Sequence, residues 1–117
     1  MAEVTIYHNP RCTKSREAMQ VIDEFGVEAD VVRYLDTPPD AATLREILSK
    51  LEDDPADLVR RDDWAELGVS ADDVSTDEGV VDVLVAHPRL LQRPLLVTPD
   101  TAIIGRPTER VRDLLAR

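Results

Sequence analysis

Two strand-like apolar runs flank a helical pattern near the N-terminus, and this order limits the possible folds more than any other feature. Residues 4–7 are β-branched or aromatic, and the turn-forming residues 8–11 follow them. Apolar residues between 18 and 25 recur at helical spacing and stop at Gly26. Residues 31–34 are strand-like again. A strand, a helix and a strand within about 30 residues predict a βαβ unit.

Helical patterns dominate the middle of the chain. Asp40 is a good N-cap for a helix that has one apolar face and continues to Leu51. Residues 52–73 are acidic and irregular, so we expect only short helical pieces there. Ser75 and Glu78 have the spacing of a capping box, which predicts another helix that ends before the next proline.

The C-terminal part returns to strand patterns. Residues 95–97 and 102–104 are apolar and flank a Thr-Pro-Asp-Thr turn, which predicts an antiparallel pair. Pro107 suits the first position of a final helix. The order βαβ, helices, ββα is that of an α/β, thioredoxin-like (glutaredoxin-like) fold with a helical insertion. We expect residues 1–117 to form one such domain.

Charge and hydropathy argue against several classes of function. The formal charge is -10, from 14 basic and 24 acidic side chains. An acidic chain is poorly suited to bind nucleic-acid phosphates or anionic membranes, so we expect neither partner. No apolar run approaches the ~18 residues of a membrane span. The N-terminal sequence shows no signal-peptide pattern.

Cys12 is the single cysteine, so the chain cannot form an internal disulfide. This predicts a reducing, cytoplasmic location. The cysteine follows a strand and a proline-containing turn, where a helix capped by Thr13 or Ser15 begins. Free N–H groups and the helix dipole favour a thiolate at such a place, and pKa values of ~3.5–7.5 are found there.

The alternative for Cys12 is a buried structural thiol. Its neighbours Arg11, Lys14 and Arg16 are basic, which favours the reactive thiolate. Ser15 could hydrogen-bond the sulfur and completes a C-x-x-S pattern. Such a site can form an adduct but lacks a second thiol to release it.

His8 precedes Cys12 by four residues and has two interpretations of equal weight. It could tune or deprotonate the thiol, or it could be a turn histidine hydrogen-bonded to the backbone. No metal site is expected, because a structural zinc needs four ligands and only these two nitrogen or sulfur ligands are near.

Arg93 and Pro94 directly precede the third predicted strand. In a thioredoxin-like fold this loop faces the N-terminus of the first helix, so we expect Arg93 near Cys12 and a cis Arg93–Pro94 bond. Guanidinium groups bind tetrahedral oxyanions through paired hydrogen bonds. For any single arginine, however, pairing with a surface carboxylate is the more common situation.

Five segments, in order, resemble the ArsC family of thiol-dependent, glutaredoxin-linked arsenate reductases. The resemblance extends from about residue 4 to about residue 115 and rests on Tyr7-His8-Asn9-Pro10-Arg11-Cys12 with Ser15-Arg16, Tyr34-Leu35-Asp36-Thr37-Pro38, Leu58-Val59-Arg60-Arg61, Arg93-Pro94-Leu95-Leu96-Val97 and Gly105-Arg106-Pro107. The chain resembles the shorter branch of the family, because it stops soon after the last helix.

The resemblance implies a role for each matching residue. Cys12 matches the nucleophile that attacks arsenate, and His8 matches a histidine near the thiol. Arg60, Arg93 and Arg106 match the arginines that bind the oxyanion. The family implies no bound cofactor; glutathione or another small thiol serves as co-substrate and glutaredoxin as partner.

The sequence therefore predicts an arsenate reductase with one cysteine nucleophile. One alternative is a regulator of the related Spx type, which binds RNA polymerase. Spx proteins typically carry a C-x-x-C, and Ser15 replaces the second cysteine here. The other alternative is a monothiol protein that transfers thiols between disulfides.

Overall fold

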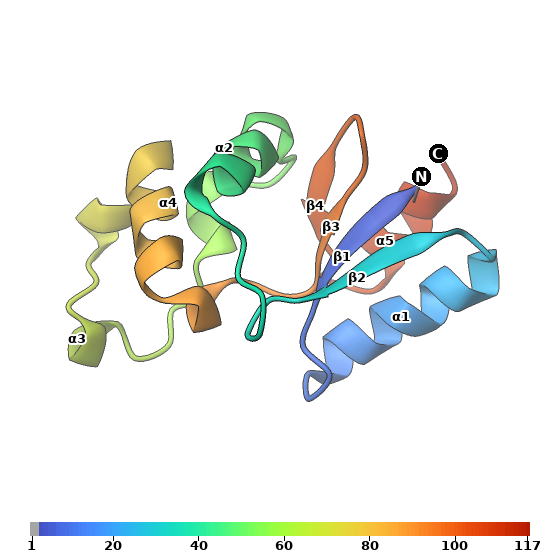
Figure 1. Cartoon of the computed structure of the whole chain (residues 1–117), viewed down its shortest axis with the longest axis horizontal. Coiled ribbons are helices and arrows are strands. Elements are labelled where there is room, and N and C mark those ends of the chain that lie inside the picture. The colour runs from blue at the N-terminus through green and yellow to red at the C-terminus, as the bar shows by residue number, and fades with distance from the viewer. Residues whose placement is uncertain (1–2) are drawn as a thin grey trace.

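In the computed structural model, four short strands form one sheet in the order β2-β1-β3-β4 (Figure 1). β1 (Val4–His8) lies parallel to β2 (Ala29–Arg33) and antiparallel to β3 (Leu95–Val97). β4 (Ala102–Ile104) pairs antiparallel with β3. α1 (Thr13–Phe25) connects β1 to β2. The predicted βαβ unit and the predicted antiparallel pair are thus both confirmed.

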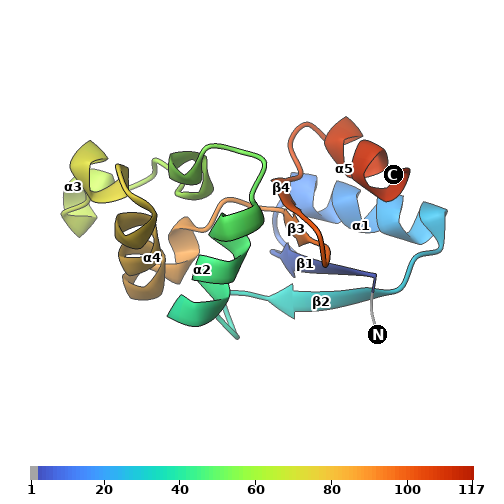
Figure 2. The ribbon, with the colours of Figure 1, turned by 90° about the horizontal axis from the view of Figure 1, so that it is seen from above.

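One face of the sheet is covered by α1 and α5 (Glu109–Leu115), which contact each other (Figure 2). Successive strand residues point to opposite faces, so alternate residues of each strand enter this layer. Its buried side chains come from three strands and both helices: Val4, Ile6, Ala18, Val21, Ile22, Leu96, Ile103, Val111 and Leu114.

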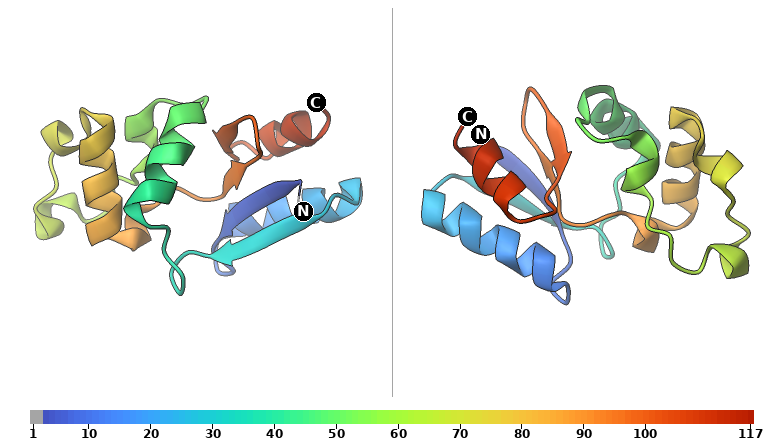
Figure 3. Two further views of the ribbon diagram at one scale, coloured as in Figure 1. Left: turned by 45° about the horizontal axis from the view of Figure 1, so that its top comes forward. Right: turned by 180° about the vertical axis from the view of Figure 1, so that it is seen from behind.

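The helical insertion, defined here as residues 41–90, packs around side chains of the opposite face, among them Tyr7, Leu95 and Ile104. It extends away from the sheet and lengthens the molecule (Figure 3). Its elements are three helices and three 3₁₀ turns: α2 (Ala41–Lys50), η1 (Pro55–Leu58), α3 (Trp64–Leu67), η2 (Ala71–Val74), α4 (Asp77–Ala86) and η3 (Pro88–Leu90). The structure describes residues 3–117, and none of the helices there is long and apolar enough to cross a membrane.

Several helix ends lie where the sequence predicts them. Asp40 caps α2, because its carboxylate accepts the Thr43 N–H at 2.8 Å. Gly26 ends α1 in the left-handed conformation, with φ 66°, which glycine adopts without steric cost. α1 itself begins directly after Cys12, so neither Thr13 nor Ser15 is the N-cap.

Two further predicted helix starts are wrong. Thr76, not Ser75, caps α4 by accepting the Gly79 N–H, because the Ser75 hydroxyl donates to the Asp72 carbonyl of the preceding 3₁₀ turn. Glu78, the other half of the predicted box, forms an ion pair with Arg45.

The last helix also starts later than predicted. Its first residue is Glu109, and Pro107 lies in the turn before it. This turn is closed by a hydrogen bond from the Arg110 N–H to the Pro107 carbonyl at 3.0 Å.

Candidate active site

Cys12 lies where the loop after β1 becomes α1. It is the N-cap residue, and its carbonyl accepts the Arg16 N–H at 3.0 Å. Its own N–H donates to the Asn9 carbonyl at 3.0 Å, which closes the preceding turn. The residue is 8% exposed. The fold therefore places the sulfur beside the unpaired N–H groups of the first helical turn.

The pKa of the Cys12 thiol is lowered from its ordinary value. Burial acts against this shift, since it disfavours the charged thiolate. Hydrogen bonds from the backbone N–H groups of Ser15 and Lys14, together with the positive charge of Arg93, outweigh the effect of burial. A larger fraction of Cys12 is therefore the nucleophilic thiolate near neutral pH than for a free cysteine.

Arg106 is in direct contact with this sulfur, with its Nη2 3.5 Å from Cys12 Sγ. The same guanidinium donates through Nε to the Arg93 carbonyl at 2.7 Å. Gly105 and Pro94 are also bonded, from N–H to carbonyl at 2.8 Å. The loops before β3 and before α5 are thus bonded to each other beside Cys12, and both arginines reach the thiol.

Gly105 makes this close approach of the two loops possible. A Cβ at this position would lie 2.8 Å from Leu96 Cδ1 and 2.9 Å from Pro94 Cγ, closer than side-chain atoms approach. The Arg93–Pro94 peptide bond is cis, in agreement with the sequence prediction, and the Arg106–Pro107 bond is cis as well.

Arg93 has unused hydrogen-bonding capacity. Its Nε and Nη1 are buried and have no hydrogen-bond partner within the described part of the chain. Buried donors without partners are rare, because each one costs the free energy of its lost hydration. A site with such donors next to a thiolate is suited to an oxyanion that would accept from them.

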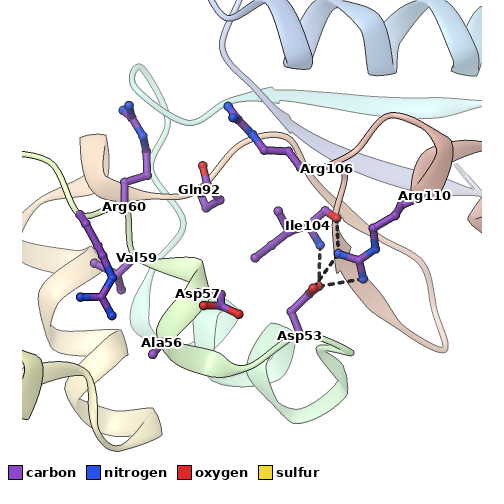
Figure 4. Close-up of a pocket in the computed structure, with 10 residues that line it drawn as sticks. Asp53, Ala56, Asp57, Val59, Arg60, Gln92, Ile104, Arg106 and Arg110 are labelled. Carbon is purple, nitrogen blue, oxygen red and sulfur yellow. Dashed lines mark hydrogen bonds and ion pairs between the residues drawn. The ribbon is translucent and has the colours of Figure 1, made fainter.

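Arg60 approaches the site from the helical insertion. It lines a cleft together with Arg106 (Figure 4). The guanidinium of Arg60 forms an ion pair with Asp62. The structure thus brings Arg93 and Arg106 to the sulfur, whereas Arg60 lies across the cleft from Arg106.

His8 and Ser15 form a buried polar pair behind the thiol. His8 Nδ1 and Ser15 Oγ are 2.6 Å apart, and the Asn9 N–H donates to the same hydroxyl at 3.0 Å. Burial lowers the pKa of His8, and the charges of Arg33 and Arg16 lower it further, so the imidazole is neutral near pH 7. The Ser15 hydroxyl is therefore engaged by His8 and Asn9, and it is the Ser15 N–H that bonds the sulfur.

Tyr34 is a site residue to which the sequence reasoning gave no role. Its side chain is fully buried, and its hydroxyl has no hydrogen-bond partner among residues 3–117. Burial raises the pKa of Tyr34, while the nearby charges of Arg93 and Arg106 act in the opposite direction. It lies in one of the segments that carry the family resemblance, and that position was the only sequence signal available.

The ion pair between Asp53 and Arg110 was also missed. Arg110 Nη1 is 2.6 Å from Asp53 Oδ1 and donates to the Ile104 carbonyl at 2.8 Å, while Asp53 Oδ2 accepts the Ile104 N–H at 2.9 Å. These bonds connect the insertion to β4 and α5 along the cleft (Figure 4). No sequence signal could have found this pair, since its two members are 57 residues apart.

The described residues contain no group of three or more histidine, cysteine or acidic side chains arranged for a metal ion. The groups that the structure brings together at the site are the Cys12 thiol, the guanidinium groups of Arg93 and Arg106, and backbone N–H donors.

The chain is similar in sequence and in structure to known proteins. The model of the ArsC family matches residues 7–114. The protein YfgD of Escherichia coli K12 is 45% identical over 97% of this chain and 97% of its own length. An arsenate reductase of Neisseria meningitidis serogroup A is 40% identical over 98% of this chain and all of its own. The solved structure of an arsenate reductase from Vibrio cholerae superposes with a TM-score of 0.80 at 31% identity, over 96% and 97% of the two chains.

Proposed function

The chain belongs to the ArsC family, and from this premise we propose that it is an arsenate reductase with Cys12 as its single nucleophile. The observation that carries the proposal is the contact of one thiol, at a helix N-terminus, with Arg106 and with the charge of Arg93. A lowered thiol pKa supplies the nucleophile, and the guanidinium groups supply donors for a tetrahedral oxyanion.

Arg93 and Arg106 bind the arsenate oxygens next to the sulfur in this proposal. The buried, unpartnered Nε and Nη1 of Arg93 support this role, because an oxyanion would satisfy them. Arg60 completes the set from across the cleft once its guanidinium moves from Asp62 toward the anion. His8 and Ser15 act as positioning residues, since their hydrogen bond fixes the loop that carries Cys12.

The reaction begins when the Cys12 thiolate attacks arsenic. A sulfur–arsenic bond forms, and one arsenate oxygen leaves as water after protonation, while arsenic remains As(V). A small thiol then replaces a second oxygen, again with loss of water. A glutaredoxin thiolate attacks the sulfur of that small thiol and forms a mixed disulfide. The electron pair of the broken sulfur–arsenic bond reduces As(V) to As(III), and hydrolysis releases arsenite and free Cys12.

Because the chain has one cysteine, the proposed reaction needs reductants from outside the chain. With Cys12 as the only cysteine, no second thiol of the chain can form a disulfide with it. We therefore assign release of the adduct to glutathione or an equivalent thiol together with glutaredoxin. Both operate in a reducing compartment, which is the reason to place the reaction in the cytoplasm.

The test is a reductase assay with purified protein, arsenate and each thiol system supplied separately. Glutathione with glutaredoxin is expected to support turnover, and Cys12→Ser is expected to abolish it without unfolding the chain, since a serine hydroxyl is a far weaker nucleophile. Full turnover with thioredoxin alone, and no need for a small thiol, would contradict the one-cysteine mechanism. Inactivity with every thiol system would favour the Spx-type regulator or the thiol-transfer protein instead.

A further inference from the structure

The cleft beside Arg106 is larger than an inorganic oxyanion requires. Its volume is about 430 Å³, and it lies between η1 of the helical insertion and the loop before α5 (Figure 4). Its walls carry positive charge from four arginines and negative charge from Asp53 and Asp57; the arginines are Arg60, Arg61, Arg106 and Arg110. A pocket of this size, with both signs of charge, is suited to an organic molecule that carries separated charges.

Asp57 is the unusual group in this cleft. Asp53 is paired with Arg110 and Asp62 with Arg60, whereas the structure gives Asp57 no ion-pair partner among the described residues. Its carboxylate lies across the cleft from the guanidinium groups of Arg60 and Arg106 (Figure 4). A free carboxylate here would repel an anion and attract a cation.

The local fold does not need Asp57 at this place. The 3₁₀ turn η1 is capped by Asp54, whose carboxylate accepts the Ala56 N–H at 3.1 Å. A second acid in the turn adds only the small dipole effect of an exposed carboxylate. The Asp57 carboxylate, which lines the cleft, is thus available to bind a ligand.

We propose that this cleft binds a small thiol derived from an amino acid, with the ligand's ammonium group on Asp57 and its sulfur directed past Arg106 toward Cys12. The proposal rests on the proposed function, for which it names the binding site of the co-substrate. Arg106 lines the cleft and also contacts the Cys12 sulfur at 3.5 Å, so a ligand that extends from the cleft past this guanidinium would approach the reacting atom.

The bound thiol would then perform the second step of the reaction. Its sulfur bonds to the arsenic on Cys12, one As–OH bond breaks, and the hydroxyl leaves as water with the proton of the thiol. Arsenic remains As(V) in this exchange, so no other oxidant or reductant is required. Asp57 is a binding residue for the co-substrate and does not touch the reacting atoms.

The experiment uses S-methylglutathione, which has the charges of glutathione but no reactive thiol. Its dissociation constant is measured by calorimetry and by backbone NMR shifts, without arsenate. We expect shifts at residues of the cleft, and about fivefold weaker binding to Asp57→Asn, the size typical of a partly exposed ion pair. The matched control, Asp100→Asn, removes an exposed carboxylate from the β3–β4 turn and is expected to leave binding unchanged.

A second probe isolates the ammonium group. N-acetyl-S-methylglutathione lacks this charge and is expected to bind wild type and Asp57→Asn equally, at the affinity of the variant for the charged probe. Equal binding of both probes to wild type, or an Asp57→Asn effect no larger than that of Asp100→Asn, would overturn the proposal. Because binding is measured without arsenate, a negative result leaves arsenate reduction itself to be decided by the turnover assay.

Discussion

The sheet half of the molecule, formed by β1 to β4 with α1 and α5, and the helical insertion contribute differently to the site. The sheet half places Cys12, Arg93 and Arg106 on short loops at the ends of paired strands, and these loops are bonded to each other. The insertion contributes Arg60 and Asp57 from short segments around η1. The difference indicates that the thiol chemistry depends on the sheet half, whereas the shape of the cleft depends on how the insertion docks.

Both apolar and polar contacts connect the two regions. Tyr7, Leu95 and Ile104 of the sheet half belong to the same buried apolar cluster as side chains of the insertion, and hydrogen bonds and an ion pair add to this packing. Asp53 pairs with Arg110, and Lys50 donates from Nζ to the Thr98 carbonyl at 2.7 Å. Such contacts each contribute modestly to stability, whereas burial of leucine and isoleucine contributes more. Substitutions in the sheet half, in the insertion and at their connection should therefore lower the free energy of unfolding by different amounts.

The largest expected effect is on the core of the sheet half. Leu96→Ala removes a fully buried side chain from the layer under α1 and α5, and we expect a loss of about 3 kcal/mol in the free energy of unfolding. Leu67→Ala, at the end of α3, removes the same atoms from a partly buried position, and we expect a loss of about 1 kcal/mol. Urea denaturation measures the free energy of unfolding of both variants, and equal losses would show that the different burial of Leu96 and Leu67 does not set the cost of truncation.

A smaller effect is expected at the connection. Asp53→Asn breaks a partly buried pair that bonds the insertion to α5, with an expected loss of about 1–2 kcal/mol. The control is Glu78→Gln, which breaks the exposed Arg45–Glu78 pair within the insertion and should cost less than about 0.5 kcal/mol. The same urea titrations compare the two variants. A larger loss for Glu78→Gln would show that the Asp53 contact does not connect the regions as described.

The smallest expected effect is a change in thiol ionisation. Because the pKa of Cys12 is lowered, alkylation by iodoacetamide should reach half its maximal rate at a lower pH than for free cysteine. Arg93→Ala removes a charge that stabilises the thiolate, so the midpoint should rise and the rate at pH 7 should fall. Arg60→Ala changes the insertion side only and should leave the midpoint unchanged. If Arg60→Ala raised the midpoint as much as Arg93→Ala, the pKa of Cys12 would depend on the insertion as much as on the sheet half, which would contradict the difference between the two regions.

The pattern of strands and helices could be predicted because it depends on local periodicity. The sequence predicts strands at residues 4–7, 95–97 and 102–104, and the structure has a strand at each of these places. Local capping was less predictable where two hydroxyls compete. Ser75 and Thr76 are adjacent, and only the carbonyl of Asp72 in the preceding turn decides that Thr76 caps α4.

The candidate site could be predicted only in part. Cys12 at a helix N-terminus follows from the order of strand, turn and helix within the first 26 residues. The contact of Arg106 with Cys12 joins residues 94 apart in the chain, and periodicity says nothing about such a pair. Family resemblance suggested an oxyanion-binding role for Arg106, but it did not suggest the pairing of Arg60 with Asp62 or that Asp57 has no ion-pair partner among the described residues.

The sequence by itself determined the elements, the single thiol and its place at the start of α1, because these depend on neighbours within a few helical turns. Only the tertiary structure decided which charges meet. It brings Arg106 to the sulfur, leaves donors of Arg93 without a partner within residues 3–117 and pairs Asp53 with Arg110. The physical reason is that ion pairs and hydrogen bonds act over a few ångströms in space, so their partners are chosen by how distant segments pack.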